Sequence, residues 1–439
     1  MMLRKLFIHF KKSILLKIVS LNSLVIGFRL VIAIVIQKLL AEMVGASGIA
    51  KIGQLRNLMA ILTSTSTFGV FNGVVKYTSE LKKEQALLSK FFSTAFIFSI
   101  AGTLISASFL FVFSSWISIQ LFGSDTFEFI VRIAAFIVPA ISLNRIFSGV
   151  VNGLSAYKQY AKIELIAYLA SSVVLLYGLF NYDINGVLIA IAIAPLVQLL
   201  VLLYVFGSVL KTQLKLKGLR LHSPFAKALL TFAAMSFIST VLINYIEIDI
   251  RSQITNEISS NQAGYWTAML FISKNYMVFS TGLFTLYVIP RFAEIYSAHD
   301  FKKEVFYIYK TILPLFAVGM ILIYIFRMLI IDVIYPGFYG MEPLFKWQLA
   351  ADFVRLSALV LAHQFLAKKM LISYVLTEFI SIILFYIFSK LLLDSHGIEG
   401  IVMAHLYRYV IYFIVVIIAI WYHFKNNKNS TPPSGLDLL

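Results

Sequence analysis

The sequence predicts an all-α, polytopic membrane protein with about twelve transmembrane helices, and three observations lead to this fold class. First, 60% of the 439 residues are hydrophobic and 13% are charged, against roughly 45–50% apolar and about 25% charged residues in soluble domains. Second, apolar stretches recur from one end of the chain to the other, and the mean hydropathy is +0.89. Third, basic residues gather in alternate loops between these stretches. No long segment remains for a soluble domain.

Twelve helices are predicted from apolar stretches of about 20–28 residues. The first half of the chain holds six of them, near residues 13–40, 48–77, 88–114, 127–154, 160–180 and 184–210. The second half holds the other six, near residues 225–250, 262–290, 303–330, 343–366, 369–393 and 397–424. The stretch after the basic start lacks a small-residue cleavage site, so we interpret it as a retained first helix and not as a signal peptide.

The charges of the loops predict the orientation of the chain. Lysines and arginines precede the first helix and follow every even-numbered helix, whereas the other loops carry mainly acids. By the positive-inside rule, both termini are therefore predicted to be cytoplasmic. The same distribution argues against nucleic acid as a partner, because the net charge of +17 is spread over many loops and does not form one basic patch.

Two similar halves are expected. Each half ends its second helix with a basic residue followed by a glutamate, Lys76 with Glu80 and Arg291 with Glu294. Duplicated halves with the substrate path between them are a transporter architecture. The expected segments are an N-terminal six-helix lobe over 1–210, a cytoplasmic linker over 211–224, a C-terminal six-helix lobe over 225–424 and a cytoplasmic tail over 425–439.

Basic side chains within the predicted helices are the candidates for substrate binding. A charge at a helix centre costs about 2.5–3.5 kcal/mol even on the lower insertion scale, so such residues should face a watery interior or a partner. Guanidinium groups match phosphate oxygens in pairs, so a lumen lined by them suits a phosphate-bearing anion. Arg251 and Arg327 lie near predicted outer ends, where reaching the lipid headgroups is an equal alternative. The candidates are Arg29, Arg56, Arg145, Arg251, Lys274, Arg327 and Arg355.

Two acids, Asp352 and Glu378, are candidates for ion coupling, because buried carboxylates of transporters can take up H⁺ or hold Na⁺. Asp352 also lies one helical turn before Arg355, so an intrahelical ion pair is an equal alternative. Cysteine is absent, and so are Walker A, HExxH and GxSxG motifs. We therefore expect no metal site, no cofactor and no covalent catalysis.

Two near-identical pieces, Gly69 to Gly73 and Gly149 to Gly153, each place small residues four positions apart. Such a spacing lets helix backbones approach closely. We therefore predict a structural role for these glycines.

Several segments resemble a known family when they are read together and in order. They are Gly45 to Arg56, Phe71 to Tyr77 and Leu344 to Asp352, with shorter similar pieces at Leu121 to Gly123, Val131 to Arg132 and Thr377 to Glu378. In these segments the chain resembles the Wzx-type flippases of the multidrug/oligosaccharidyl-lipid/polysaccharide (MOP) exporter superfamily. The similar members are O-antigen translocases and the lipid III flippases of enterobacterial common antigen.

The resemblance implies a V-shaped, MATE-like bundle of two six-helix lobes. It further implies alternating access that moves an undecaprenyl-diphosphate-linked oligosaccharide, an O-antigen unit or lipid III, from the cytoplasmic to the periplasmic leaflet of the cell inner membrane. Membrane lipids, a polysaccharide polymerase and a chain-length regulator are the implied partners. On this resemblance Arg29, Arg56, Arg251 and Arg327 face or flank the lumen, and Asp352 and Glu378 are coupling acids.

Three alternatives remain open at this point. A drug or cation exporter of the same superfamily is the main one, although organic cations need acids or aromatic faces and not a cationic lumen. A membrane-embedded polymerase or ligase would carry a long extramembrane loop. A peptidoglycan lipid II flippase would carry helices beyond twelve.

Overall fold

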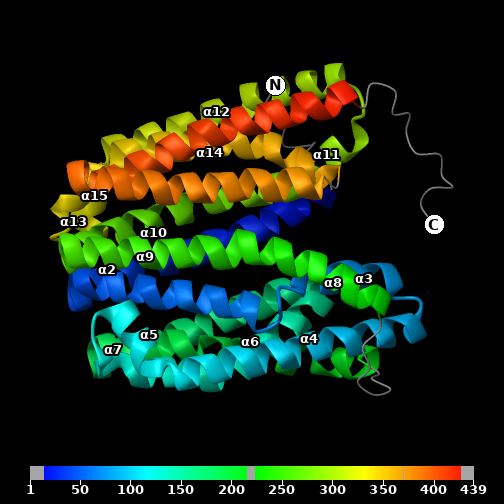
Figure 1. Ribbon diagram of the computed structural model, residues 1–439, viewed down its shortest axis with the longest axis horizontal. Coiled ribbons are helices and arrows are strands. Elements are labelled where there is room, and N and C mark those ends of the chain that lie inside the picture. The colour runs from blue at the N-terminus through cyan, green and yellow to red at the C-terminus, as the bar shows by residue number, and fades with distance from the viewer. Residues whose placement is uncertain (1–13, 215–222, 369, 427–439) are drawn as a thin grey trace. The chain divides into compact units, whose positions relative to one another are not determined.

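The computed structural model describes residues 14–214, 223–368 and 370–426, and these residues are almost entirely helical (Figure 1). Within them, side chains are described except at 14–26, 213, 223–224, 281–283 and 285–286. No strand occurs in these ranges, so the predicted all-α class is confirmed. The basic start, most of the expected linker 211–224 and most of the expected tail 425–439 lie outside the described residues.

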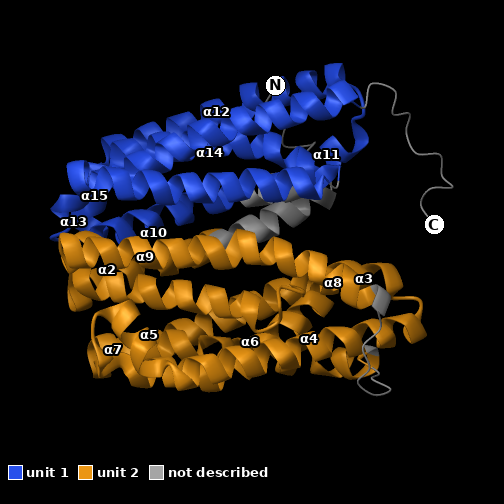
Figure 2. Ribbon diagram, in the orientation of Figure 1, with its two compact units in different colours: residues 1–21, 265–439 blue, residues 22–264 orange. Residues whose placement is uncertain are grey.

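The chain divides into two compact units, coloured separately in Figure 2. One comprises residues 22–264, and the other comprises residues 1–21 with 265–439. The expected division into lobes at 1–210 and 225–424 stays a prediction.

The first unit contains most of α2 and the helices up to α9. Their bounds are α2 (Ile14–Thr65), α3 (Phe71–Leu81), α4 (Gln85–Val112), α5 (Ser114–Phe122), η1 (Asp125–Phe127), α6 (Glu128–Gly153), α7 (Tyr157–Gln213), α8 (Ser223–Ser236), η2 (Phe237–Leu242) and α9 (Ile243–Glu257).

The second unit contains the later helices, together with the start of α2. Their bounds are α10 (Ser260–Leu283), η3 (Phe284–Val288), α11 (Ile289–Glu294), α12 (Ala298–Ile325), α13 (Arg327–Ile334), η4 (Tyr339–Met341), α14 (Leu344–Ala367) and α15 (Leu371–Asn426). The first five residues of α10 belong to the other unit.

Eight helices in the described part of the chain are long and apolar enough to cross a membrane. Three of them contain a break, α2 at Gly45, α7 at Tyr182 and Asp183, and α15 at Gly397. Each break lies at or beside a predicted junction between two spans, so each of these helices corresponds to two of them. Gly45 and Gly397 have φ angles of 65° and 55°, in the left-handed region that glycine adopts without steric cost.

The predicted helix near residues 48–77 is interrupted in the structure. α2 ends at Thr65 and α3 begins at Phe71, and Gly69 between them has a φ of 65°. The backbone oxygen of Ser66 at this break accepts hydrogen bonds from Ser142 Oγ at 3.3 Å and Thr103 Oγ1 at 3.4 Å. Hydroxyls of neighbouring helices thus satisfy a polar group that lipid could not.

Two short π-helical segments interrupt other long helices. η2 lies between α8 and α9, and η3 lies between α10 and α11. A π-helical turn holds more residues than an α-helical one and occurs frequently at functional sites. Neither segment was predicted, because both have the same apolar composition as the helices around them.

Glycines hold α3 close to its neighbours in the first unit. A Cβ on Gly149 of α6 would lie 2.8 Å from the side chain of Val74, and one on Gly153 would lie 2.8 Å from the backbone oxygen of Val75. Gly73 of α3 faces α8 in the same way, with a side-chain carbon 2.6 Å from the position of its Cβ. The predicted close approach of helices is confirmed for Gly149 and Gly153 of α6, whereas Gly69 lies in the break between α2 and α3 and does not share a helix with Gly73.

Each unit has its own buried apolar cluster. In the first unit this cluster includes Phe91 and Phe92 of α4, and in the second it includes Phe292 of α11, Phe365 of α14 and Tyr412 of α15. The charged residues described next lie among such apolar surroundings.

Candidate functional site

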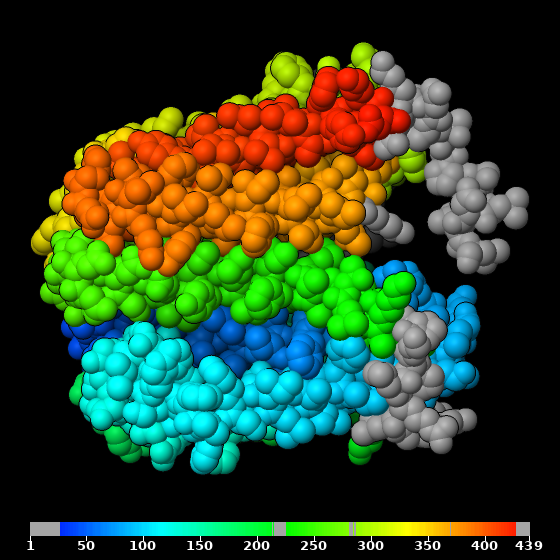
Figure 3. All heavy atoms as spheres, viewed as in Figure 1, coloured from blue at the N-terminus to red at the C-terminus, as the bar shows by residue number. Residues whose placement is uncertain are grey.

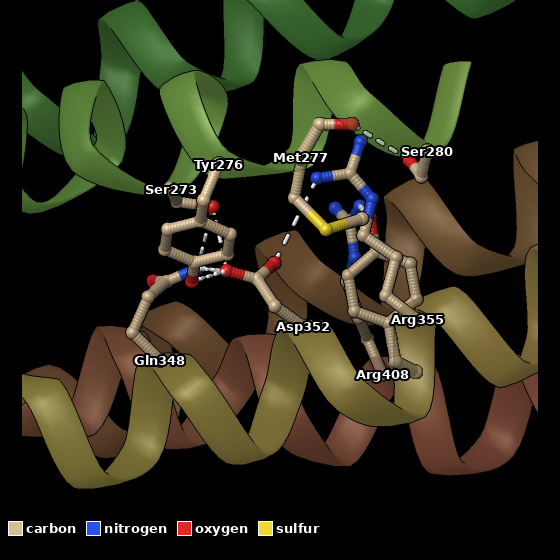
Figure 4. A network of polar contacts seen from close by, with 9 residues as sticks. Ser273, Tyr276, Met277, Ser280, Gln348, Asp352, Arg355 and Arg408 are labelled. Atoms are coloured by element: carbon tan, nitrogen blue, oxygen red, sulfur yellow. Dashed lines mark hydrogen bonds and ion pairs between the residues drawn. The ribbon is translucent and has the colours of Figure 1, made fainter. Parts of the chain in front are cut away.

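Asp352 is the centre of a buried polar network in the second unit (Figure 4). It lies on α14 and is 0% exposed. Its Oδ2 accepts hydrogen bonds from Ser273 Oγ at 2.6 Å, from the hydroxyl of Tyr276 and from Gln348 Nε2 at 2.9 Å. Ser273 and Tyr276 lie one turn apart on α10, and Gln348 lies one turn before Asp352, so α10 and α14 bring all the donors to one carboxylate oxygen.

Arg355 connects this network to a cavity of about 310 Å³. Its Nη1 lies 3.8 Å from Asp352 Oδ1, an ion pair between residues one helical turn apart. The Arg355 side chain is 34% exposed, whereas that of Asp352 is fully buried. The cavity is lined by polar side chains and by apolar ones, namely Lys274, Met277, Val278, Ser280, Phe284, Arg355, Leu359 and His363. Because Lys274 and Arg355 both line it, an anion in this cavity could pair with two cationic side chains.

His363 is held at the cavity wall by two contacts. Its Nδ1 lies 2.6 Å from the backbone oxygen of Leu359 and therefore donates to it, and its ring stacks on Phe284 at 4.3 Å between centroids. The Nε2 atom is then left as the acceptor of the neutral ring.

A second arginine, Arg408 on α15, lies close to the same network (Figure 4). It is 6% exposed, donates from Nη2 to the hydroxyl of Tyr409 at 2.6 Å, and stacks over the rings of Phe385 and Tyr409. Its Nε and Nη1 have no hydrogen-bond partner among the described residues. Glu378, the other predicted coupling acid, accepts a hydrogen bond from the hydroxyl of Tyr412 at 2.8 Å.

The first unit holds its own group of basic residues around Glu164 on α7. Arg29 of α2 pairs with Glu164 through Nη1 and Oε2 at 3.3 Å, although the two residues are 135 positions apart. The guanidinium of Arg29 also lies over the ring of Tyr168, 4.7 Å from its centroid. Tyr168 is within electrostatic reach of Arg56 as well.

Arg145 on α6 belongs to the same group. Its guanidinium lies 3.8 Å from the ring centroid of Phe71 on α3, and it is within electrostatic reach of Glu164. Its Nε is buried without a hydrogen-bond partner in the described structure. Arg29 and Arg145 thus lie around Glu164 and the rings of Tyr168 and Phe71, and Arg56 acts electrostatically on Tyr168 of the same group.

Arg251 is placed differently from these residues. It lies on α9, is 2% exposed, and donates from Nη1 to the side-chain oxygen of Gln54 on α2 at 3.0 Å. Other polar contacts run along the same pair of helices, from Gln54 Nε2 to Ser252 Oγ at 2.9 Å and from Asn57 Nδ2 to Glu247 Oε2 at 3.1 Å. In this arrangement Arg251 joins two helices.

Arg327 lies at the start of α13, away from the Asp352 network. Its Nε pairs with Glu342, its Nη1 donates to the backbone oxygen of Tyr324 at 2.9 Å, and its guanidinium lies over the Tyr324 ring. The hydrogen bond that Arg327 donates to Glu342 raises the pKa of Arg327, so this cation stays charged at any ordinary pH.

Comparison with known proteins places the chain in a family. The sequence profile of the polysaccharide biosynthesis proteins matches residues 51–339, which is more than half of the chain. The chain belongs to this family. Lipid III flippases of Escherichia coli (strain K12) and Shigella flexneri are each 25% identical to it over 391 residues, covering 87% of this chain and 92% of each relative.

Solved structures show which fold this polysaccharide biosynthesis protein has. The lipid II flippase MurJ in an inward closed conformation matches with a TM-score of 0.72 and 15% identity, over 92% of this chain and 87% of that one. An inward-facing multidrug resistance MATE family transporter of the MOP superfamily matches with a TM-score of 0.71 and 12% identity, over 89% of this chain and 94% of that one. The expected MOP-type, MATE-like fold is therefore confirmed.

Within this family member, the structure brings Lys274, Asp352 and Arg355 together in one unit and Arg29, Arg56 and Arg145 together in the other. Arg251 and Arg327 belong to neither group. Sequence reasoning did not assign the partners, which are Glu164, Tyr168, Ser273, Tyr276, Gln348 and Arg408. Two signals were available in the sequence. Glu164 and Arg408 are charges within apolar stretches, and Ser273 and Tyr276 are spaced to share one helix face. No group of three or more metal-binding side chains occurs among the residues that the structure describes.

Proposed function

We propose that this protein is a flippase, which carries a lipid-linked oligosaccharide from the cytoplasmic to the periplasmic leaflet of the inner membrane by alternating access. One observation carries the proposal, namely the cavity lined by Lys274 and Arg355 within a membrane-spanning bundle. The 25% identity to lipid III flippases over most of both chains supports it. The substrate class that fits is an undecaprenyl-diphosphate-linked saccharide, either an O-antigen unit or lipid III.

A cationic cavity addresses the main physical obstacle to flipping such a lipid. Moving an unpaired diphosphate into hydrocarbon would cost tens of kcal/mol on a Born estimate. Arg355 offers a planar fork that pairs with two phosphate oxygens, and Lys274 offers a mobile point charge. We propose that both contact the diphosphate when it passes through the second unit, and that Arg29, Arg56 and Arg145 contact it in the first.

The Asp352–Arg355 pair suggests how binding of the substrate could be coupled to binding of an ion. Arg355 is half-buried and faces the cavity, so a diphosphate there would compete with Asp352 for its guanidinium. Loss of that pairing would leave a fully buried carboxylate without its counter-charge, a state that costs about 3–5 kcal/mol in measured cases. Asp352 would then take up H⁺ or Na⁺. Arg29, paired with Glu164 across two helices, would release its acid in the same way.

The membrane potential would assist this direction of transport. If about two negative charges move outward across a membrane that is ~100 mV negative inside, the field favours the movement by roughly 4–5 kcal/mol. We propose further that both termini are cytoplasmic, that transport involves no covalent step, and that a polysaccharide polymerase and a chain-length regulator act with the protein in its pathway. Arg251 and Arg327 are proposed to flank the path, and Glu378 is proposed as a second coupling acid.

Complementation tests the proposed function. The full chain is expressed in Gram-negative strains that lack their O-antigen flippase or their common-antigen flippase, and surface polysaccharide is measured beside the lipid-linked intermediate. We expect rescue in one strain and its loss with Arg355→Ala or Arg29→Ala. Arg132→Ala is the matched control, because Arg132 is an exposed arginine paired with Glu128 on its own helix.

Two outcomes would contradict the proposal. If both the Arg355→Ala and the Arg29→Ala variants still rescue the strain, the proposal that these arginines bind the diphosphate is wrong. Resistance to organic cations in place of rescue, with membrane insertion confirmed, would favour the drug exporter.

A further inference from the structure

A polar pocket of about 310 Å³ lies in the first unit where α2, α5 and α9 meet. Its lining combines amides, hydroxyls and one cation, among them Lys51, Gln54, Gln120, Ser252 and Asn256. Amides and hydroxyls can both donate and accept hydrogen bonds, as the hydroxyls of a sugar do. By the loop charges, this end of the bundle is the one predicted to face the periplasm.

The pocket wall is built by contacts between helices. Ser252 Oγ donates to the backbone oxygen of Gln120 at 3.0 Å, which ties α9 to the end of α5. α5 stops there at Gly123, whose φ of 71° needs a glycine. Gln54 donates to Ser252 and accepts from the buried Arg251, so a second positive charge lies directly behind the wall. None of the lining residues is acidic, and the pocket is therefore complementary to an anionic, hydroxyl-rich group.

An apolar groove of about 680 Å³ adjoins this pocket. Figure 3 shows it as a hollow, with α2 in blue on its floor between α4 and α5 in cyan and α8 and α9 in green. Aromatic side chains line it and are about half exposed or more, among them Phe109, Trp116 and Tyr245. Gln120 and Leu121 line both cavities, so the groove and the polar pocket adjoin each other at the end of α5.

We propose that the pocket and the groove together form an outer-leaflet site for the transported lipid, with the phosphosugar in the polar pocket and the polyprenyl chain in the apolar groove. This inference rests on the proposed function and adds a second binding position to it, separate from the cavity at Arg355. Lys51 pairs with the phosphate, and the exposed amides of Gln120 and Asn256 bond to the first sugar, while Gln54 stays bonded to α9. The groove covers hydrocarbon that would otherwise meet water or headgroups. The pocket offers hydrogen-bond acceptors as well as donors. A phosphodiester has no donor and leaves these acceptors unused, whereas the hydroxyls of a sugar can bond to both. The site therefore selects a lipid-linked saccharide over an ordinary phospholipid.

Photo-cross-linking tests this site in the full chain. The probe is undecaprenyl diphosphate N-acetylglucosamine with a diazirine on the sugar, added to the protein in phosphatidylcholine nanodiscs, and the labelled peptides are mapped by mass spectrometry. We expect labels within residues 47–54 and 119–123. Labelling there should fall about tenfold with Lys51→Ala or Gln120→Ala, the loss that one charge-assisted or paired hydrogen bond predicts. Lys38→Ala is the matched control, because Lys38 is an exposed lysine of the same helix, paired with Glu42.

Competition and complementation separate the outcomes. Unlabelled lipid-linked sugar should remove the label, and phosphatidylglycerol at the same concentration should not. Equal removal by phosphatidylglycerol, or labelling that ignores both substitutions, would overturn the inference in favour of an ordinary lipid contact. If rescue of a flippase-deficient strain is intact while these segments remain unlabelled, this inference fails and the proposed function stands. If the label behaves as expected and no strain is rescued, the site holds and the proposed function fails.

Discussion

Arg251 donates a hydrogen bond from its guanidinium to the side-chain oxygen of Gln54 across 3.0 Å, and this contact joins α9 to α2. The amide nitrogen of Gln54 returns to α9, donating to the backbone oxygen of Ile248 at 3.2 Å and to Ser252 at 2.9 Å. One glutamine therefore serves three groups of the facing helix. Since Arg251 is 2% exposed, this contact also gives a buried charge a polar partner.

Gln54→Leu should lower the stability of the protein by about 1–3 kcal/mol, because it removes a hydrogen-bond acceptor from a buried cation and leaves Ser252 without this donor. The measurement is the apparent melting temperature of the purified protein in detergent. Gln54→Glu is the matched control, since it keeps an acceptor for Arg251. Identical melting temperatures for Gln54→Leu and the unmodified protein would show that the contact contributes nothing.

Asp352 and Arg355 should be energetically coupled. Asp352→Asn and Arg355→Gln are each expected to destabilise the protein, whereas the double variant should lose less than the sum, with a coupling energy of about 0.5–3 kcal/mol. The physical reason is that either single change leaves a charge without its partner at 3.8 Å. The measurement is a double-mutant cycle, in which the melting temperatures of the unmodified protein, the two single variants and the double variant are compared. Strict additivity would mean that the two groups do not interact.

Phe71→Leu tests the contact between the ring of Phe71 and the guanidinium of Arg145 at 3.8 Å. Leucine keeps an apolar side chain on α3 but has no π face, so we expect a loss of about 0.5–2 kcal/mol. Phe71→Tyr keeps the face and should be close to the unmodified protein. Thermal unfolding followed by intrinsic fluorescence compares the three, and equal losses for leucine and tyrosine would point to shape instead of charge.

Gly178→Ala should destabilise the hairpin within α7. A Cβ on Gly178 would lie 2.5 Å from the backbone oxygen of Gly186. Because this neighbour is backbone and not a flexible side chain, it cannot move away to relieve the overlap. Overpacking of this kind costs about 1–3 kcal/mol. Gly207 lies on the same helix with nothing within 4 Å of its Cβ position, so Gly207→Ala should be neutral or stabilising. Folded yield by size-exclusion chromatography ranks the two variants.

Much of the helix arrangement follows from apolar length and glycine alone. The predicted span 343–366 appears as α14, Leu344–Ala367, because the bilayer sets how long an apolar helix must be. The breaks at Gly45 and Gly397 follow from a residue that reverses the chain without strain. The break between Thr65 and Phe71 could not be predicted, since it depends on hydroxyls of Thr103 and Ser142, which are distant in sequence.

The candidate site was predictable in its charges and not in its pairings. A lysine or arginine in an apolar stretch stands out in any sequence, and Lys274 and Arg355 do line one cavity. The pairing of Arg29 with Glu164 could not be predicted, because the two residues are 135 positions apart and only the fold brings them together. The Asp352–Arg355 pair was weighed correctly as an alternative because its two members share one helix turn.

The π-helical segment η2, Phe237–Leu242, lies directly before the start of α9. A π turn holds one residue more than an α-helical turn, so its conversion to α-helix would rotate everything beyond it by roughly 100° about the helix axis. Glu247 and Arg251 would then point away from Asn57 and Gln54 without any unfolding of α9. The polar contacts between α2 and α9 therefore form in only one rotational orientation of α9. Inserting or deleting a single residue in η2 would change that orientation.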